Sequence, residues 1–290
     1  MKRPLVFGEV LFDVFSDGRE ILGGAPFNVA WHLQGFGCSP LMISRVGRDV
    51  RGEKILARMR DWGMDLAGLR IDADHPTGIV RVSLRDGQPT YDILPEQAYD
   101  YIDTPELGRL PDDALLIHGT LAARSPVAAR ALTQIAGQYD WPVFLDVNLR
   151  APWWRRDAVE TLMKRARWLK LNADELRLLA GGSPDAALDL LQATGAEWAL
   201  VTAGEKGAQL WHRSGNRIAV ASCKADSFID AVGAGDAFCS VVVLGLLAGW
   251  PSDIALSRAA RFAGEICGIP GATTENRGLY DRFRDEWGLA

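Results

Sequence analysis

The chain of 290 residues carries 32 Lys and Arg side chains against 37 Asp and Glu side chains, which gives a net charge of −5. This negative balance argues against nucleic acid or an anionic membrane as a partner. The longest apolar stretch, residues 237–247, is too short to span a bilayer, which takes about 20 residues.

Four cysteines lie far apart in the sequence and form no C-x-x-C pair. This spacing fits free thiols in a reducing compartment better than a disulfide or zinc framework. The four histidines show no metal-binding spacing. The apolar residues 5–7, which follow a basic start, are too few for a signal peptide. We therefore expect a cytoplasmic protein, whose length suits one large domain.

Short apolar runs rich in β-branched residues alternate with amphipathic segments of helix length. This rhythm predicts an α/β fold with a mainly parallel sheet that helices cover on both faces. The expected strands are 5–9, 41–45, 114–118, 143–147, 168–171 and 198–202, followed by a hairpin of 208–211 and 218–220. The expected helices are 26–34, 52–62, 126–139, 173–179, 184–194, 234–247 and 254–268.

Two stretches, 77–84 and 90–94, interrupt this rhythm with alternating apolar and polar residues around Asp86-Gly87. This pattern predicts an antiparallel hairpin. Because the hairpin falls outside the main rhythm, we expect a lid, to which residues 10–15 and 99–102 add strands. The chain has no internal repeat or linker, so we expect one domain, 1–290, with a lid excursion from approximately 10–20 and 77–103.

The most informative motif is residues 230–236, with the sequence Asp-Ala-Val-Gly-Ala-Gly-Asp, directly before an apolar helix. Small residues here let the N–H groups of residues 233–236 converge on an anion at the positive end of the helix. The Asp236 carboxylate would repel a phosphate unless it has a task, such as taking a proton from an attacking hydroxyl. Phosphoryl transfer to an alcohol is one interpretation. The other is a glycine-rich turn with Asp236 as a helix-start acid.

A second glycine cluster, Gly23-Gly24, opens the first expected helix, and Pro26 suits the first turn of that helix. The glycines would let a polar substrate approach the backbone, and Asn28 can offer a donor and an acceptor to sugar hydroxyls. The alternative is a tight strand-to-helix turn with Asn28 at the surface. Asp13 lies among apolar residues, so its side chain should face solvent or hold hydroxyl donors.

Five motifs in this order and separation resemble those of ribokinase-like carbohydrate kinases of the phosphofructokinase-B type, most of all fructokinases. Residues 23–30 (GGAPFNVA) resemble the N-terminal signature of that family, and residues 230–236 resemble its C-terminal signature, D-T-x-G-A-G-D. Between them lie counterparts of D-x-N-x-R, N-x-x-E and T-x-G-x-x-G, which are residues 146–150, 172–175 and 202–207. The match covers nearly the whole chain.

The resemblance implies a three-layer α/β/α sandwich with a small β lid. It also implies transfer of the γ-phosphoryl group of ATP, with Mg²⁺, to a primary hydroxyl of a small sugar. Asp236 would be the catalytic base, and the N–H groups of Gly233, Ala234 and Gly235 would form the anion hole.

The family motifs also imply binding residues. The sugar would contact Asp13, Gly24, Asn28 and Arg150, whose planar guanidinium could also reach an anionic group. Asn172 and Glu175 would organise Mg²⁺ through water, although the same pair could be a helix cap. The nucleotide would be bound by Asn172, Thr202, Gly204, Gly207, Ala260 and Gly264.

Two features bear on ions and substrate. Ala231 stands where the signature has Thr, and Asp230 could still contribute to a monovalent cation site, so K⁺ dependence stays open. Trp153 and Trp154 after Arg150 favour fructose. The alternatives are 2-keto-3-deoxygluconate, ribose and a nucleoside, and the choice would fall to Arg150 and the lid residues Tyr91, Ile93 and Tyr99.

Other classes of protein remain alternatives. One is a sugar- or nucleotide-binding regulator without turnover. A dinucleotide-dependent oxidoreductase is weaker, because no G-x-G-x-x-G follows the first strand. Open strand edges in the lid predict a homodimer that pairs lid against lid.

Overall fold

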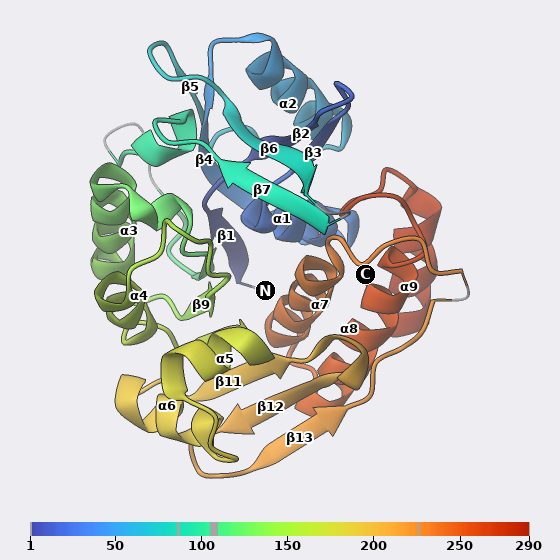
Figure 1. Cartoon of the computed structure of the whole chain (residues 1–290). Helices are drawn as coiled ribbons and strands as arrows, with labels where there is room; N and C mark the ends of the chain where they lie inside the picture. The colour runs from blue at the N-terminus through green and yellow to red at the C-terminus, as the bar shows by residue number, and fades with distance from the viewer. Residues whose placement is uncertain (1, 86–87, 105–109, 226, 290) are drawn as a thin grey trace.

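The computed structural model describes residues 2–85, 88–104, 110–225 and 227–289. Its main sheet has the strand order β13-β12-β11-β10-β9-β8-β1-β4-β5 (Figure 1). The strands from β11 to β5 run parallel, whereas β12 pairs antiparallel with both β11 and β13. The bounds are β1 Arg3–Phe7, β4 Leu41–Gly47, β5 Leu69–Asp72, β8 Ala114–His118, β9 Val143–Asp146, β10 Trp168–Asn172, β11 Trp198–Thr202, β12 Ala208–His212 and β13 Arg217–Val220.

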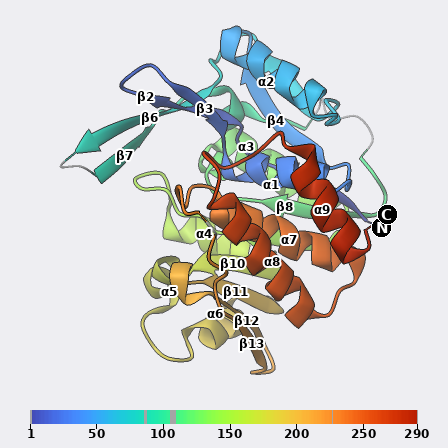
Figure 2. The same ribbon diagram turned by 90° about the vertical axis from the view of Figure 1, so that its right-hand side faces the viewer.

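Helices cover both faces of this sheet, so the molecule has three layers (Figure 2). Successive residues of a strand point to opposite faces, and accordingly Leu5 and Phe7 belong to one apolar core and Val6 to the other. The layer on the Val6 side contains α1 Ala25–Gly35, α2 Val50–Asp61, α7 Ala234–Ala248, α8 Ser252–Ile266 and α9 Arg277–Trp287. The opposite layer contains α3 Pro126–Gln138, α4 Arg156–Met163, α5 Ala173–Ala180 and α6 Ala186–Thr194.

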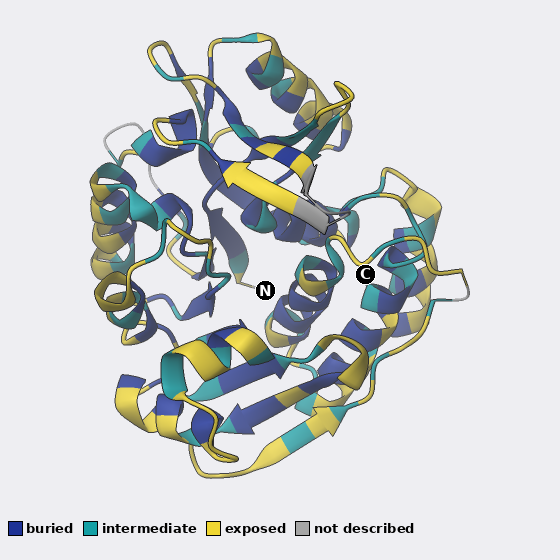
Figure 3. Ribbon diagram, viewed as in Figure 1, coloured by how far each residue is buried: buried dark blue, intermediate teal, exposed yellow. Residues whose placement is uncertain are grey.

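The central strands are buried on both faces, as Figure 3 shows in dark blue. Every residue of β8 and β9 is buried, and this explains why these strands are almost unbroken apolar runs. The structure confirms the predicted α/β class and every strand predicted for the main sheet. Among the described residues, no helix is long and apolar enough to cross a membrane.

A second sheet with the strand order β3-β2-β6-β7 projects beyond the edge of the three layers (Figure 2). Its strands are β2 Leu11–Phe15, β3 Glu20–Gly23, β6 Gly78–Arg85 and β7 Gln88–Ile93. The last two pair antiparallel; the Asp86-Gly87 turn that we expect to join them lies outside the described residues.

One predicted strand is wrong. Residues 99–102, expected to extend the lid, overlap a 3-10 helix, η1 (Ala98–Tyr101). A capping box between Gln97 and Asp100 begins this helix, and Asp100 forms a buried ion pair with Arg124. Tyr99 is fully buried in the core and does not line the cleft described below, so it cannot choose a substrate by contact.

Candidate active site

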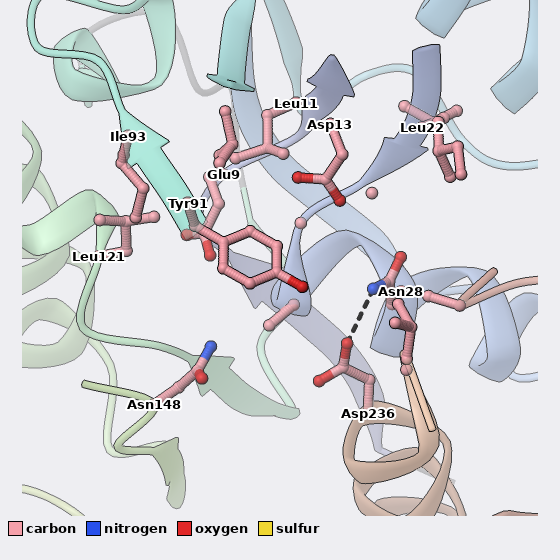
Figure 4. Close-up of a pocket in the computed structure, with 18 of the residues that line it drawn as sticks. Glu9, Leu11, Asp13, Leu22, Asn28, Tyr91, Ile93, Leu121, Asn148 and Asp236 are labelled. Carbon is pink, nitrogen blue, oxygen red and sulfur yellow. Dashed lines mark hydrogen bonds between the residues drawn. The ribbon is translucent and has the colours of Figure 1, made fainter. Parts of the chain in front are cut away.

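A cleft of about 360 Å³ lies between the second sheet and the N-terminus of α7 (Figure 4). Its walls come from β2, β3, β7, the start of α1, the loop after β9 and the start of α7, which meet at the carboxyl edge of the parallel strands. This is where α/β folds place ligands, and the volume suits a small molecule. The predicted residues that line it are Asp13, Gly24, Asn28, Tyr91, Ile93, Arg150, Gly233 and Asp236.

The glycine-rich motif forms the base of the cleft. Gly233 precedes α7 in the left-handed conformation, with φ 77, and a Cβ there would lie 2.4 Å from the Ala272 Cα atom. Only glycine fits this contact. The Ala234 N–H group closes a turn on the Ala231 carbonyl oxygen at 3.2 Å. The N–H groups of Gly235 and Asp236 lie in the first helical turn, where no helical carbonyl can accept them.

Asp236 touches the second glycine motif. Asn28 donates through Nδ2 to Asp236 Oδ2 at 2.8 Å, and Asn28 Oδ1 is buried without a hydrogen-bond partner from the residues described. Burial raises the pKa of Asp236 to about 6, although Lys170 and the Asn28 hydrogen bond oppose the shift. A carboxyl with this pKa is mostly ionised at neutral pH, so it can accept a proton. Its pKa also lies near neutral pH, where a general base works best.

A buried ion pair lies beneath the motif. Lys170 on β10 is the register partner of Asp146 on β9, and its Nζ atom lies 3.0 and 2.9 Å from the two Asp146 carboxylate oxygens. The same Nζ atom is 3.7 Å from the position that a Cβ atom of Gly235 would occupy. Burial alone would lower the pKa of Lys170, but Asp146 together with Cys239 and Asp236 more than offsets burial, and the pKa is raised. Sequence reasoning missed Lys170.

Sequence reasoning also missed Glu9, which follows β1 and lines the cleft. Its side chain is buried, and its Oε2 atom has no hydrogen-bond partner in the part of the chain that the structure describes. Burial raises the pKa of Glu9 to about 7, and burial likewise raises that of Asp13 to about 6. An acid at the carboxyl end of the first strand was the available signal.

Asn172 and Glu175 form the helix cap that was their alternative interpretation. Asn172 Oδ1 accepts hydrogen bonds from the N–H groups of Asp174 and Glu175 at 3.0 and 2.9 Å. The Glu175 carboxylate accepts from the N–H groups of Asn172 and Leu149 at 2.8 and 2.7 Å. Each of its oxygens keeps a second lone pair. This arrangement fits a Mg²⁺ ion held through water. Among the described residues, no cluster of three or more His, Cys, Asp or Glu side chains could hold a metal directly.

The remaining predicted residues lie outside the cleft lining. Gly204 begins the 3-10 helix η3 (Gly204–Lys206) after β11 and Gly207 follows it, with φ values of 55 and 85. Ala260 is 6% exposed and packs in the core. A Cβ on Gly264 would lie 2.7 Å from the Cys223 carbonyl oxygen, so α8 packs directly on that backbone. Other predicted residues outside the lining are Thr202, with Oγ1 3.4 Å from the Leu171 carbonyl oxygen, and Asp230, which accepts from the Val232 N–H group at 2.7 Å.

Comparison with known proteins matches residues 12–277 to the pfkB family carbohydrate kinase. The fructokinase of Klebsiella pneumoniae is 28% identical over 97% of this chain and 96% of its own length. The ATP-dependent 6-phosphofructokinase of Thermoanaerobacterium thermosaccharolyticum is 24% identical over 96% of this chain and 93% of its own. The solved structure of fructokinase from Vibrio cholerae O395 with fructose, ADP and calcium ion bound superposes with a TM-score of 0.84 and 23% identity, covering 97% of this chain and 98% of that one.

Proposed function

The chain belongs to the pfkB family of carbohydrate kinases and is an ATP-dependent sugar kinase, and on that premise we propose that it phosphorylates a primary hydroxyl of a neutral sugar, fructose before others. The observation that carries the proposal is the position of Asp236. Its carboxyl stands at the N-terminus of α7, which favours an anion, and in the wall of the cleft, where an acceptor hydroxyl would lie.

In the proposed reaction, the sugar oxygen bonds to the γ-phosphorus while the bond between that phosphorus and the bridging oxygen of ADP breaks. Asp236 takes the hydroxyl proton. The N–H groups at the start of α7 and the helix dipole stabilise the charge on the transferred group. Asn28 holds the Asp236 carboxylate in place through its 2.8 Å hydrogen bond.

The charges in the cleft favour a neutral acceptor. Of the described residues that line it, Glu9, Asp13 and Asp236 carry carboxyl groups and Arg150 carries a guanidinium. A phosphorylated sugar or a sugar acid would bring its own negative charge against three acids and one base. We therefore propose fructose as a better substrate than 2-keto-3-deoxygluconate. We also propose it as a better substrate than the phosphosugar indicated by the name of the 6-phosphofructokinase relative. Ribose and a nucleoside are also neutral and stay as alternatives.

We propose that ATP follows the edge of the sheet past Asn172, Thr202, Gly204 and Gly207, with Ala260 and Gly264 on the adenine side. Mg²⁺ would be held through water by Asn172 and Glu175, and it would neutralise phosphate charge. Asp230 would serve a monovalent cation such as K⁺. These assignments rest on the family motifs.

The second sheet is proposed as a lid, since Tyr91 and Ile93 of β7 line the cleft while Tyr91 is 54% exposed. Strands β3 and β7 end this sheet, so its edges would suit a homodimer that pairs lid against lid. Trp153 supports the adjoining wall, because its Nε1 atom donates to the Ile93 carbonyl oxygen at 3.0 Å. The four free cysteines accord with a cytoplasmic location.

The test is ADP release with MgATP across fructose, fructose 6-phosphate, ribose, 2-keto-3-deoxygluconate, adenosine and inosine, with and without K⁺. We expect saturable turnover with fructose and little with the two charged sugars. Turnover confined to a charged sugar would contradict the argument from cleft charge. ATP binding without turnover on any acceptor would favour the alternative of a sugar- or nucleotide-binding regulator.

A further inference from the structure

Glu9 is a buried acid whose position its neighbours do not explain. The residue is 2% exposed and lines the cleft, yet its Oε2 atom has no hydrogen-bond partner among the described residues. Figure 4 shows Glu9 among the residues that line this cleft, together with Asn148 and Asp236. A buried polar atom without a partner destabilises a fold, so this carboxyl fits a cleft in which a ligand supplies the missing donor.

The backbone keeps Glu9 at the substrate side. A Cβ on Gly24 would lie 2.6 Å from the Glu9 carbonyl oxygen, so Gly24 and Glu9 are packed backbone to backbone. A side chain at position 24 would push Glu9 out of the cleft wall. Gly24, which the family motif assigns to sugar binding, therefore also keeps the Glu9 backbone in the cleft wall.

The nearby cations do not pair with Glu9 by a hydrogen bond. Arg124 is close enough to lower its pKa, as is Arg150, while Asp236 raises it. Arg124, however, is directed to Asp100, with Nε–Oδ1 and Nη2–Oδ2 distances of 2.8 Å. No described residue hydrogen-bonds to its Nη1 atom, which is also buried. Arg150 donates to the Leu149 carbonyl oxygen at 3.4 Å.

We propose that the Glu9 carboxyl selects the acceptor by accepting a hydrogen bond from a sugar hydroxyl other than the one that is phosphorylated. This inference rests on the proposed function, because it concerns the sugar of that same cleft. A buried acceptor made for a hydroxyl discriminates strongly against an analogue that lacks it, since the acceptor then stays unpaired. Glu9 is thereby a specificity residue, distinct in task from Asp236.

The experiment combines Glu9 variants with the monodeoxy analogues of the sugar that wild type uses best, each analogue lacking one hydroxyl that does not react. We expect Glu9→Leu to lower kcat/KM for the complete sugar by roughly 10- to 100-fold, the effect of leaving a buried polar partner unpaired. The KM for ATP should stay within about twofold. For one analogue, the kcat/KM of wild type should be lower than for the complete sugar by a similar factor. For Glu9→Leu, the kcat/KM values for that analogue and for the complete sugar should be almost equal. This coupling would identify the hydroxyl that Glu9 binds.

Glu9→Gln keeps the shape of the side chain and tests the carboxyl if the leucine variant fails to fold. Glu20→Gln is the matched control, since Glu20 lies on β3 outside the cleft lining and pairs with Arg51 and Lys54. If both Glu9 variants lose activity equally on every analogue, Glu9 only supports the fold and the proposal is overturned. If wild type phosphorylates no sugar at all, the proposed function has failed instead.

Discussion

Asn28 and Asp236 are joined by an Nδ2–Oδ2 hydrogen bond of 2.8 Å across 208 residues of sequence. Asn28 lies in the first turns of α1 and Asp236 in the first turn of α7, two helices that begin side by side (Figure 1). The bond therefore ties the glycine cluster on the sugar side to the glycine-rich motif on the phosphate side. It also adjusts the proposed base, because it opposes the rise in pKa that burial imposes on Asp236.

Asn28→Ala should move the pH dependence of catalysis. Without the Asn28 donor the pKa of Asp236 rises above about 6, and a base must be ionised to work. Activity is lost as the pH falls through that pKa, so the acidic limb of the kcat/KM profile should shift to higher pH. Gln34→Ala, on the same helix and outside the cleft lining, should leave the limb in place. If the acidic limb of Asn28→Ala stays at the wild-type pH, that limb does not report the ionisation of Asp236.

Asp236→Asn should lower kcat by roughly 10² to 10⁴, the usual contribution of a positioned general base. Nucleotide binding should persist, because the substitution leaves the backbone N–H groups of the first α7 turn in place. Turnover and calorimetric ATP binding measure the two properties separately. A variant that binds ATP and turns over at the wild-type rate would remove Asp236 from the mechanism.

Lys170→Met should destabilise the fold by about 3–5 kcal/mol, since it leaves the buried Asp146 carboxylate without its cation. The double substitution Lys170→Met with Asp146→Leu should recover most of that loss, which denaturant unfolding can measure. The double variant should stay less active than wild type at neutral pH, because Lys170 lowers the pKa of Asp236 by more than Asp146 raises it. Full activity in the double variant would make the pair purely structural.

The core strands were predictable because a strand that is buried on both faces has an almost continuous apolar sequence. β8 and β9 are buried at every position, whereas the missed β5 is a four-residue strand with the sequence LRID. The missed helix α9 did carry a signal, since its buried residues Tyr280, Phe283 and Trp287 recur at helical spacing. The error at Tyr99 arose because a capping box and an ion pair with Arg124 decided the local structure.

The site was predictable where motifs are local and not where burial creates the chemistry. Asn28 and Asp236 each stand in a local glycine motif, and the order and separation of the five motifs made these residues predictable. Lys170 looks like a solvated lysine until the register of β10 and β9 places it opposite Asp146. The raised pKa of Glu9 comes first from its burial in the folded protein. The local sequence around Glu9 does not reveal this burial.

The stability of the protein should report the buried Glu9 carboxyl directly. Its pKa is about 7 in the folded protein against an ordinary value of 4.5, so the folded state holds this proton more tightly than the unfolded state. The contribution to stability is therefore fully present below the unfolded pKa and is lost as the pH rises through about 7. The loss amounts to about 3 kcal/mol when it is complete.

Glu9→Gln cannot ionise, so its stability relative to wild type should rise by about 3 kcal/mol between pH 4 and pH 9. Urea unfolding of both proteins at the two ends of that range measures the change. Glu20→Gln should show the opposite sign, because ion pairs with Lys54 and Arg51 lower the pKa of Glu20. The substitution therefore removes stability that is fully present above the unfolded pKa of Glu20. An equal difference between Glu9→Gln and wild type at both ends would mean that Glu9 keeps an ordinary pKa. It would then be a hydrated acid and not the buried carboxyl with an unpartnered Oε2 atom on which the selection of the acceptor depends.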